Sequence, residues 1–154
     1  MRLDDVILPN GKSSKREVVE HAGAVTVVAI TNDQKVLLVK QYRYPVGEVL
    51  LELPAGGLNQ GEAPLKCAKR ELKEETGWEA TDWEELPTFY TTPGFTNEKM
   101  YLFLAKNLTY TGQNLDEDEF IQVVSVPLDE TLNMIQRGEI RDAKSIVGIL
   151  LAKA

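Results

Sequence analysis

Short apolar runs separated by turn residues dominate the first third of the chain. Two β-prone runs flank the Pro-Asn-Gly turn at 9–11, so residues 2–8 and 15–21 are predicted to pair as a hairpin. The segments "AGAVTVVAIT" (22–31) and "KVLLVKQYRY" (35–44) lack strict alternation, which is typical of strands buried on both faces. The run "VLLELPAGG" (49–57) predicts a short strand that enters a Pro/Gly loop.

A helical pattern follows this loop. Apolar residues recur at helical spacing, at Leu65, Ala68 and Leu72. Pro64 suits the first turn of a helix and Gly77 suits the position after the last turn, so we expect a helix over about residues 63–76.

The remaining segments alternate between the two kinds of element. Strands are predicted near 83–91, 98–105 and 120–126, and helices near 128–137 and 142–152, the last capped by Asp142. Strands and helices intermixed in this way predict an α/β fold, a mixed β-sheet sandwiched between α-helices. We expect a single domain over residues 1–154, with residues 1–21 as an N-terminal hairpin.

Composition and charge restrict the function classes. The net charge of −7 argues against nucleic acid or an anionic membrane as partner, since both require a cationic surface. The longest apolar run, at 146–152, is too short to span a bilayer, and the chain starts without an apolar signal region. With Cys67 as the single cysteine, no internal disulfide framework is available. We therefore expect a cytoplasmic protein.

The segment "RELKEETGW" (70–78) brings three carboxylates together. On a helix, Glu71, Glu74 and Glu75 fall within an arc of roughly 100°, where like charges repel. One interpretation is a solvated helical face on which Arg70 and Glu74 form an ion pair. The other is a site for a hard divalent cation, which takes oxygen ligands and relieves the repulsion.

The residues around these carboxylates favour the second interpretation. Gly56 is followed by five residues and Glu62, then by seven residues and Arg-Glu-Leu (70–72), Glu-Glu (74–75) and Gly77. Position for position, this pattern resembles the Nudix box, and only Trp78 departs from it, where the family carries a bulky aliphatic residue. A match that fixes so many positions is highly specific.

The resemblance implies a Nudix fold and hydrolysis of a nucleoside diphosphate linked to another moiety. It also implies Mg²⁺ as cofactor, for which Mn²⁺ can substitute. When the positions of the motif are matched to this sequence, the resemblance implies metal ligands at Glu71, Glu74, Glu75 and the main-chain oxygen of Ala55. Arg70 is expected to orient the cluster through charge-assisted hydrogen bonds, and Glu74, Glu75 and Arg70 form the expected catalytic set.

Segments outside the Nudix box indicate which branch of the family the chain resembles. A proline, Pro93, follows Gly77 after fifteen residues within "YTTPGFTNE", and "QYRYPVGEVLLELPAGGL" precedes the box. Together these segments resemble the ADP-ribose pyrophosphatase branch, which implies cleavage of ADP-ribose or a close ADP-sugar to AMP and ribose 5-phosphate. Two alternatives remain open. One is a different nucleoside diphosphate derivative (a dinucleoside polyphosphate, an NAD-type dinucleotide or a nucleoside triphosphate), and the other is a non-catalytic nucleotide-sensing module.

Several residues are predicted to bind this substrate. Arg43 is the candidate phosphate clamp, because a guanidinium can hold two phosphate oxygens at once. Glu52 either assists the metal site or faces solvent. Pro93 and Gly94 form the loop typical of the branch, and Glu98 is expected to contact the backbone of that loop or a ribose.

The base that activates the water is expected outside the helix. The resemblance to this branch implies a glutamate on a later loop, and "NLDEDEF" (114–120) falls in the corresponding place. Asp116, Glu117, Asp118 and Glu119 are all candidates, of which we favour Glu119 and Glu117.

The expected protein partner is a second copy of the chain. The N-terminal hairpin carries apolar residues at 6–8, and an exposed hairpin of this kind favours association. We therefore expect a homodimer.

Overall fold

The computed structural model describes residues 1–113 and 120–153. Within these residues the elements are β1 (Arg2–Ile7), β2 (Ser13–Val18), β3 (Ala24–Ala29), β4 (Lys35–Arg43), β5 (Glu48–Glu52), β6 (Ala55–Gly57), α1 (Pro64–Thr76), β7 (Trp78–Tyr90), β8 (Lys99–Tyr110), β9 (Ile121–Pro127), α2 (Leu128–Gln136) and α3 (Ala143–Lys153). The predicted helices and most predicted strands are confirmed within a few residues.

The arrangement of strands and helices confirms an α/β fold, but the strands form separate sheets and not the single mixed sheet that was expected. One sheet has the order β6-β3-β8-β7, in which β3 and β8 are parallel, and a second has the order β5-β4-β9. The hairpin β1-β2 pairs by itself. Strands β7 and β8 extend further than predicted because they pair antiparallel almost throughout, from Trp78 opposite Tyr110 to Tyr90 opposite Lys99.

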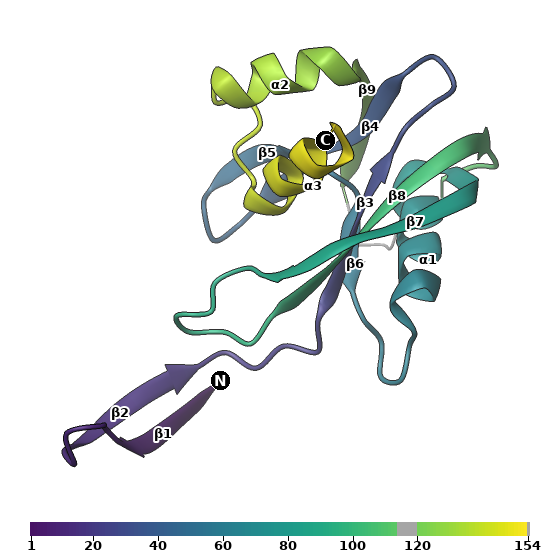
Figure 1. Cartoon of the computed structure of the whole chain (residues 1–154). Helices are drawn as coiled ribbons and strands as arrows, with labels where there is room; N and C mark the ends of the chain where they lie inside the picture. Colours follow the sequence, from purple (N-terminus) through teal and green to yellow (C-terminus); the bar gives the residue numbers. More distant parts are fainter. Residues whose placement is uncertain (114–119, 154) are drawn as a thin grey trace.

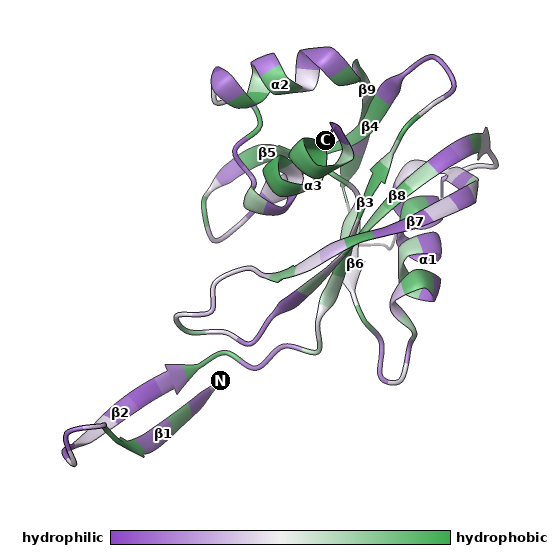
Figure 2. Ribbon diagram, in the orientation of Figure 1, coloured by the Kyte–Doolittle hydropathy of each residue, from purple (hydrophilic) through white to green (hydrophobic). Residues whose placement is uncertain are grey.

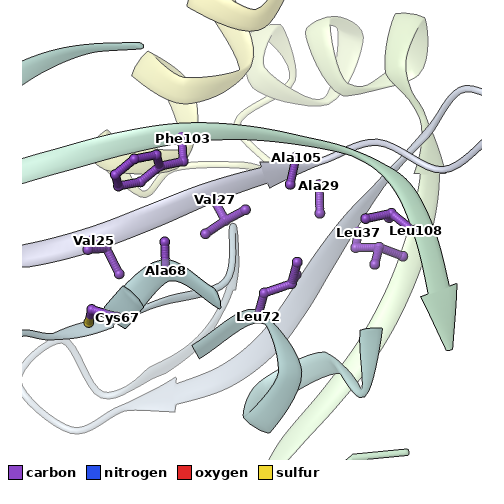
Figure 3. Close-up of a cluster of buried hydrophobic side chains, with 10 residues drawn as sticks. All are labelled: Val25, Val27, Ala29, Leu37, Cys67, Ala68, Leu72, Phe103, Ala105 and Leu108. Atoms are coloured by element: carbon purple, nitrogen blue, oxygen red, sulfur yellow. The ribbon is translucent and has the colours of Figure 1, made fainter. Parts of the chain in front are cut away.

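Strand β3 lies at the centre of the fold, and every residue in it is buried. Val25, Val27 and Ala29 pack in one cluster with α1, together with Leu72 of that helix (Figure 3). Val28, between them in sequence, belongs to a second cluster with residues of α3. Helices therefore cover both faces of this sheet, as the absence of alternation predicted.

The N-terminal hairpin projects away from the rest of the molecule (Figure 1). Its connection includes a hydrogen bond of 2.8 Å from the Val19 N–H to the carbonyl of Phe95. Apolar Leu3 and Ile7 on β1 are exposed. Hydrophilic and hydrophobic positions are mixed along this hairpin (Figure 2). Among the helices of the described residues, none has the length and apolar character needed to cross a membrane.

Candidate active site

Helix α1 directs two of its three clustered carboxylates toward the sheet. Glu71 is 9% exposed and Glu75 only 2%, whereas Glu74 is half-buried. The helix ends at Gly77, which adopts a left-handed φ of 76° and donates its N–H to the carbonyl of Lys73. A solvated helical face would leave these glutamates in water, so that interpretation is wrong for Glu71 and Glu75.

Strand β6 approaches α1 so closely that residue 56 has no room for a side chain. A Cβ atom placed on Gly56 would lie 2.0 Å from the carboxyl carbon of Glu71 and 2.0 Å from its Oε1. The same atom on the neighbouring Gly57 would meet nothing within 4 Å. The first glycine of the motif therefore allows the Glu71 carboxylate to lie directly against the main chain of the loop.

The second buried carboxylate is bonded to the same strand. The Ala55 N–H donates to Oε2 of Glu75 over 2.9 Å. At the other end of the residue, the Glu75 carbonyl accepts a hydrogen bond from Nε2 of Gln113 at 2.5 Å. Three of the four predicted metal ligands, Ala55, Glu71 and Glu75, thus lie together where β6 meets α1.

Arg70 links the carboxylates of this region. Its Nε and Nη2 donate to Glu62 at 3.1 and 3.0 Å, and its Nη1 donates to Glu71 at 2.7 Å and to Glu74 at 3.0 Å. Hydrogen bonds to Glu62 are the largest cause of a raised pKa at Arg70. In return, hydrogen bonds from Arg70 lower the pKa of Glu62 to about 2. The i,i+4 pair that the sequence suggested is present, as one contact of a larger network.

The donor set suits a hard divalent cation by its chemistry. Glu71, Glu74, Glu75 and the Ala55 carbonyl offer only oxygen ligands, which Mg²⁺ prefers. Within residues 1–113 and 120–153, however, no group of three or more His, Cys, Asp or Glu side chains converges as a metal site. Glu71 and Glu74 share the Arg70 guanidinium, while Glu75 accepts from Ala55.

A cavity of about 370 Å³ adjoins strand β6. Residues from five segments line it, among them His21, Arg43, Ala55, Gly56, Glu98 and Lys144. Ala55 and Gly56 form part of its wall, and these two residues also contact Glu75 and Glu71. The cavity therefore adjoins the carboxylate cluster and adds two cationic side chains.

Arg43 is held in the cavity by a buried carboxylate. Its Nε and Nη2 donate to the two oxygens of Glu52, each over 2.8 Å, and Glu52 is only 1% exposed. The hydrogen bonds to Glu52 raise the pKa of Arg43. Burial acts to raise the pKa of Glu52, but the hydrogen bonds from Arg43 and the charge of Lys144 lower it overall. Of the two alternatives for Glu52, a solvent-facing position is therefore wrong.

The loop between β7 and β8 contributes Thr91, Thr92 and Glu98 to the cavity wall. Thr91 donates from its hydroxyl to Glu98 over 2.6 Å, and Nε2 of His21 lies 3.5 Å from the other oxygen of Glu98. The Gly23 N–H donates to Nδ1 of His21, so the ring proton is on Nε2, toward Glu98. Pro93 and Gly94 are exposed on this loop and are not among the residues that line the cavity.

Two charged residues of the cavity wall, Asp142 and Lys144, were not predicted as site residues from the sequence. Asp142 was expected only as a helix cap, and a lysine in a first helical turn is usually a surface residue. The one sequence signal that could have indicated them was the position of Asp142 and Lys144 after a short loop, because charged residues there can reach a neighbouring strand. The base candidates Glu117 and Glu119 lie outside the described residues.

The chain is similar in sequence to several known proteins. The family model described as "NUDIX domain" matches residues 20–147. An "ADP-ribose pyrophosphatase" of Bacillus subtilis (strain 168) is 46% identical over 149 residues, which cover 96% of this chain and 80% of the relative. A "Methanol dehydrogenase activator" of Bacillus methanolicus is 46% identical over 151 residues, which cover 97% of this chain and 82% of that protein.

A solved structure shares the fold. The "Crystal structure of ADP compounds hydrolase" superposes with a TM-score of 0.83 at 26% sequence identity. The alignment covers 97% of this chain and 81% of that one.

Proposed function

This chain belongs to the NUDIX family, and we propose that it is a hydrolase that cleaves the diphosphate of ADP-ribose, or of a close ADP-sugar, to AMP and ribose 5-phosphate. One observation carries the proposal. The buried carboxylates of α1 contact Ala55 and Gly56 on the wall of a cavity that also presents Arg43 and Lys144. The name of the Bacillus subtilis relative supports ADP-ribose as the substrate.

The family implies a divalent metal cofactor, and we propose Mg²⁺, with Mn²⁺ able to substitute. Glu71, Glu74, Glu75 and the carbonyl of Ala55 would hold it, because they supply oxygen ligands close to the cavity wall. When bound, such an ion lowers the pKa of water and neutralises charge on a diphosphate. Arg70 keeps the surrounding carboxylates in place through its hydrogen bonds to Glu71 and Glu74.

The substrate is bound by the remaining groups of the cavity. Arg43 is fixed by Glu52 on one edge of its guanidinium, and its side chain remains 39% exposed, so it can donate to phosphate oxygens. Glu98 accepts from Thr91 and is only partly exposed, which leaves acceptor capacity for a ribose hydroxyl. Pro93 and Gly94 would shape the loop on which Thr91 and Glu98 are placed.

A general base has to accept a proton from the attacking water. Glu119 and Glu117 remain the proposed bases. If one of them acts in this way, its replacement by glutamine lowers kcat and removes the acidic limb of the pH–rate profile, whereas KM stays nearly constant.

A second candidate function comes from the relative of Bacillus methanolicus, whose name is that of an enzyme activator. A protein that only binds nucleotide or a partner enzyme does not need three clustered carboxylates beside a cavity. The presence of Glu71, Glu74 and Glu75 in the motif therefore favours hydrolysis.

We also propose that the chain forms a homodimer in the cytoplasm. The exposed Leu3 and Ile7 of the projecting hairpin favour contact with a second copy, as does the exposed Val19. Cys67 is a buried free thiol, which is compatible with a reducing compartment. Light scattering on the purified protein tests the dimer directly.

The test of the reaction is a substrate panel. Purified protein is incubated with ADP-ribose, a dinucleoside polyphosphate, an NAD-type dinucleotide and a nucleoside triphosphate, each with Mg²⁺ and with Mn²⁺, and the products are chromatographed. We expect AMP and ribose 5-phosphate from ADP-ribose, with the highest kcat/KM of the panel. Faster turnover of another member would transfer the assignment to that substrate, and nucleotide binding without metal-dependent turnover would favour the non-catalytic alternative.

A further inference from the structure

Lys144, in the first turn of α3, is largely buried at the cavity wall. Its side chain is 12% exposed, and its ammonium group forms ion pairs with Glu52 and, over 2.8 Å, with Asp142. Neither the family motif nor the proposed ligand set includes this residue. A lysine buried between two carboxylates at the wall of the proposed substrate cavity requires an explanation.

The first turn of α3 is attached to the end of β5. Asp142 accepts hydrogen bonds from the N–H of Ser145 at 3.0 Å and from its hydroxyl at 2.5 Å. The Ser145 hydroxyl oxygen in turn accepts from the N–H of Leu53 at 2.7 Å, and Leu53 directly follows Glu52. The position of Lys144 relative to Glu52 is therefore set by hydrogen bonds on both sides of the contact.

Glu52 is shared between two cations. Arg43 occupies both of its oxygens from one direction, and Lys144 donates to Oε2 as well. Arg43 and Lys144 together balance the charges of Glu52 and Asp142, so the cluster as a whole is neutral. Without Lys144 the cluster would carry an excess negative charge next to any diphosphate bound in the cavity, and the carboxylate of Glu52 would compete more strongly for the Arg43 guanidinium.

We propose that Lys144 is a positioning residue of the substrate site. It neutralises Glu52 and thereby leaves the exposed edge of Arg43 free to bind a phosphate group of the substrate. This inference rests on the proposed function, because it assumes a phosphate-bearing ligand in the cavity. It assigns to α3 a part in substrate binding in addition to its packing on β3.

The test compares Lys144→Met, which keeps an unbranched apolar side chain but removes the charged group, with wild type. We expect KM for ADP-ribose to rise about 10-fold or more, the size of one lost charge-assisted hydrogen bond, while kcat changes by less than about 3-fold. Lys153→Met is the matched control, since Lys153 lies on the same helix but pairs with the exposed Asp129. Lys144→Arg, which keeps the charge, should recover most of the wild-type KM.

A double-mutant cycle separates positioning from general structural support. If Lys144 acts through Arg43, then Lys144→Met in an Arg43→Ala background raises KM by less than about 2-fold. Additive effects of the two substitutions would overturn the proposal, as would a KM for Lys144→Met equal to that of the control. Thermal melts accompany each variant, and Lys144→Gln replaces Lys144→Met if the latter does not fold.

A binding experiment distinguishes a failure of the proposed reaction from a failure of the proposed role of Lys144. Calorimetric titration of wild type and Lys144→Met with ADP-ribose in EDTA measures binding without turnover. A wild type that binds but does not hydrolyse ADP-ribose refutes the proposed reaction, while a weaker Kd in Lys144→Met still supports the role of Lys144. A wild type that binds ADP-ribose neither in EDTA nor in the presence of Mg²⁺ overturns both.

Discussion

Gly56→Ala is a small substitution for which the structure predicts a large loss of activity. The new methyl carbon would lie 2.0 Å from the carboxyl carbon of Glu71, and ordinary contact begins near 3.4 Å. The carboxylate therefore has to move by more than about 1 Å, and displacement of a reacting group by that distance can reduce turnover about 100-fold. The backbone of Gly56 is not in the left-handed region, so alanine can adopt its conformation and the clash with Glu71 is the effect that the substitution tests.

The assay measures kcat and KM for ADP-ribose at saturating Mg²⁺, together with the melting temperature. We expect kcat to fall about 100-fold, while the melting temperature changes by only a few degrees. The clash can be relieved by rotation of the Glu71 side chain, so the hydrophobic core need not be disturbed. The matched control is Gly57→Ala, whose added atom would meet nothing within 4 Å. Equal activity in both variants would refute the argument that Glu71 must lie against the loop.

Three further predictions follow from other contacts. Glu75→Gln keeps an oxygen that can accept from the Ala55 N–H, so the fold should survive, but kcat should fall by orders of magnitude; a loss below about 10-fold in a steady-state assay would contradict the ligand role. Burial raises the pKa of Cys67 to about 12, so we expect iodoacetamide to label it at neutral pH only after denaturation, as followed by mass spectrometry; rapid labelling of the native protein would contradict its burial. In Gly148→Val the Cβ would lie 2.6 Å from Cδ1 of Leu53, and overpacking should lower the free energy of unfolding by about 1–3 kcal/mol in urea titrations; unchanged stability would show that this core can adjust.

The sequence predicted α1 closely because local signals were strong and consistent. The expected range of 63–76 became Pro64–Thr76, with the proline in the first turn and Gly77 at the end. Strand β6, by contrast, has only three residues, Ala55–Gly57, and no strand pattern of its own. It exists because it pairs with β3, from Ala24 opposite Gly57 to Thr26 opposite Ala55, and local sequence does not encode such pairing.

The carboxylates of the site were predictable from their spacing, but their surroundings were not. The motif selected Glu71, Glu74 and Glu75, yet the burial of Glu71 and Glu75 arises from the approach of β6. Likewise, Glu52 and Lys144 are far apart in sequence and meet only because α3 is fixed to the end of β5. Contacts of this kind depend on the tertiary structure, which local sequence patterns do not report.

The most direct test of the account is anomalous diffraction from crystals grown with Mn²⁺ and a non-hydrolysable analogue of ADP-ribose. We predict manganese peaks among the carboxylates of Glu71, Glu74 and Glu75 and the carbonyl of Ala55, with the diphosphate of the analogue bound to the same ions. A diphosphate bound in the cavity with manganese elsewhere, or with none, would contradict the claim that the carboxylates of α1 hold the catalytic metal.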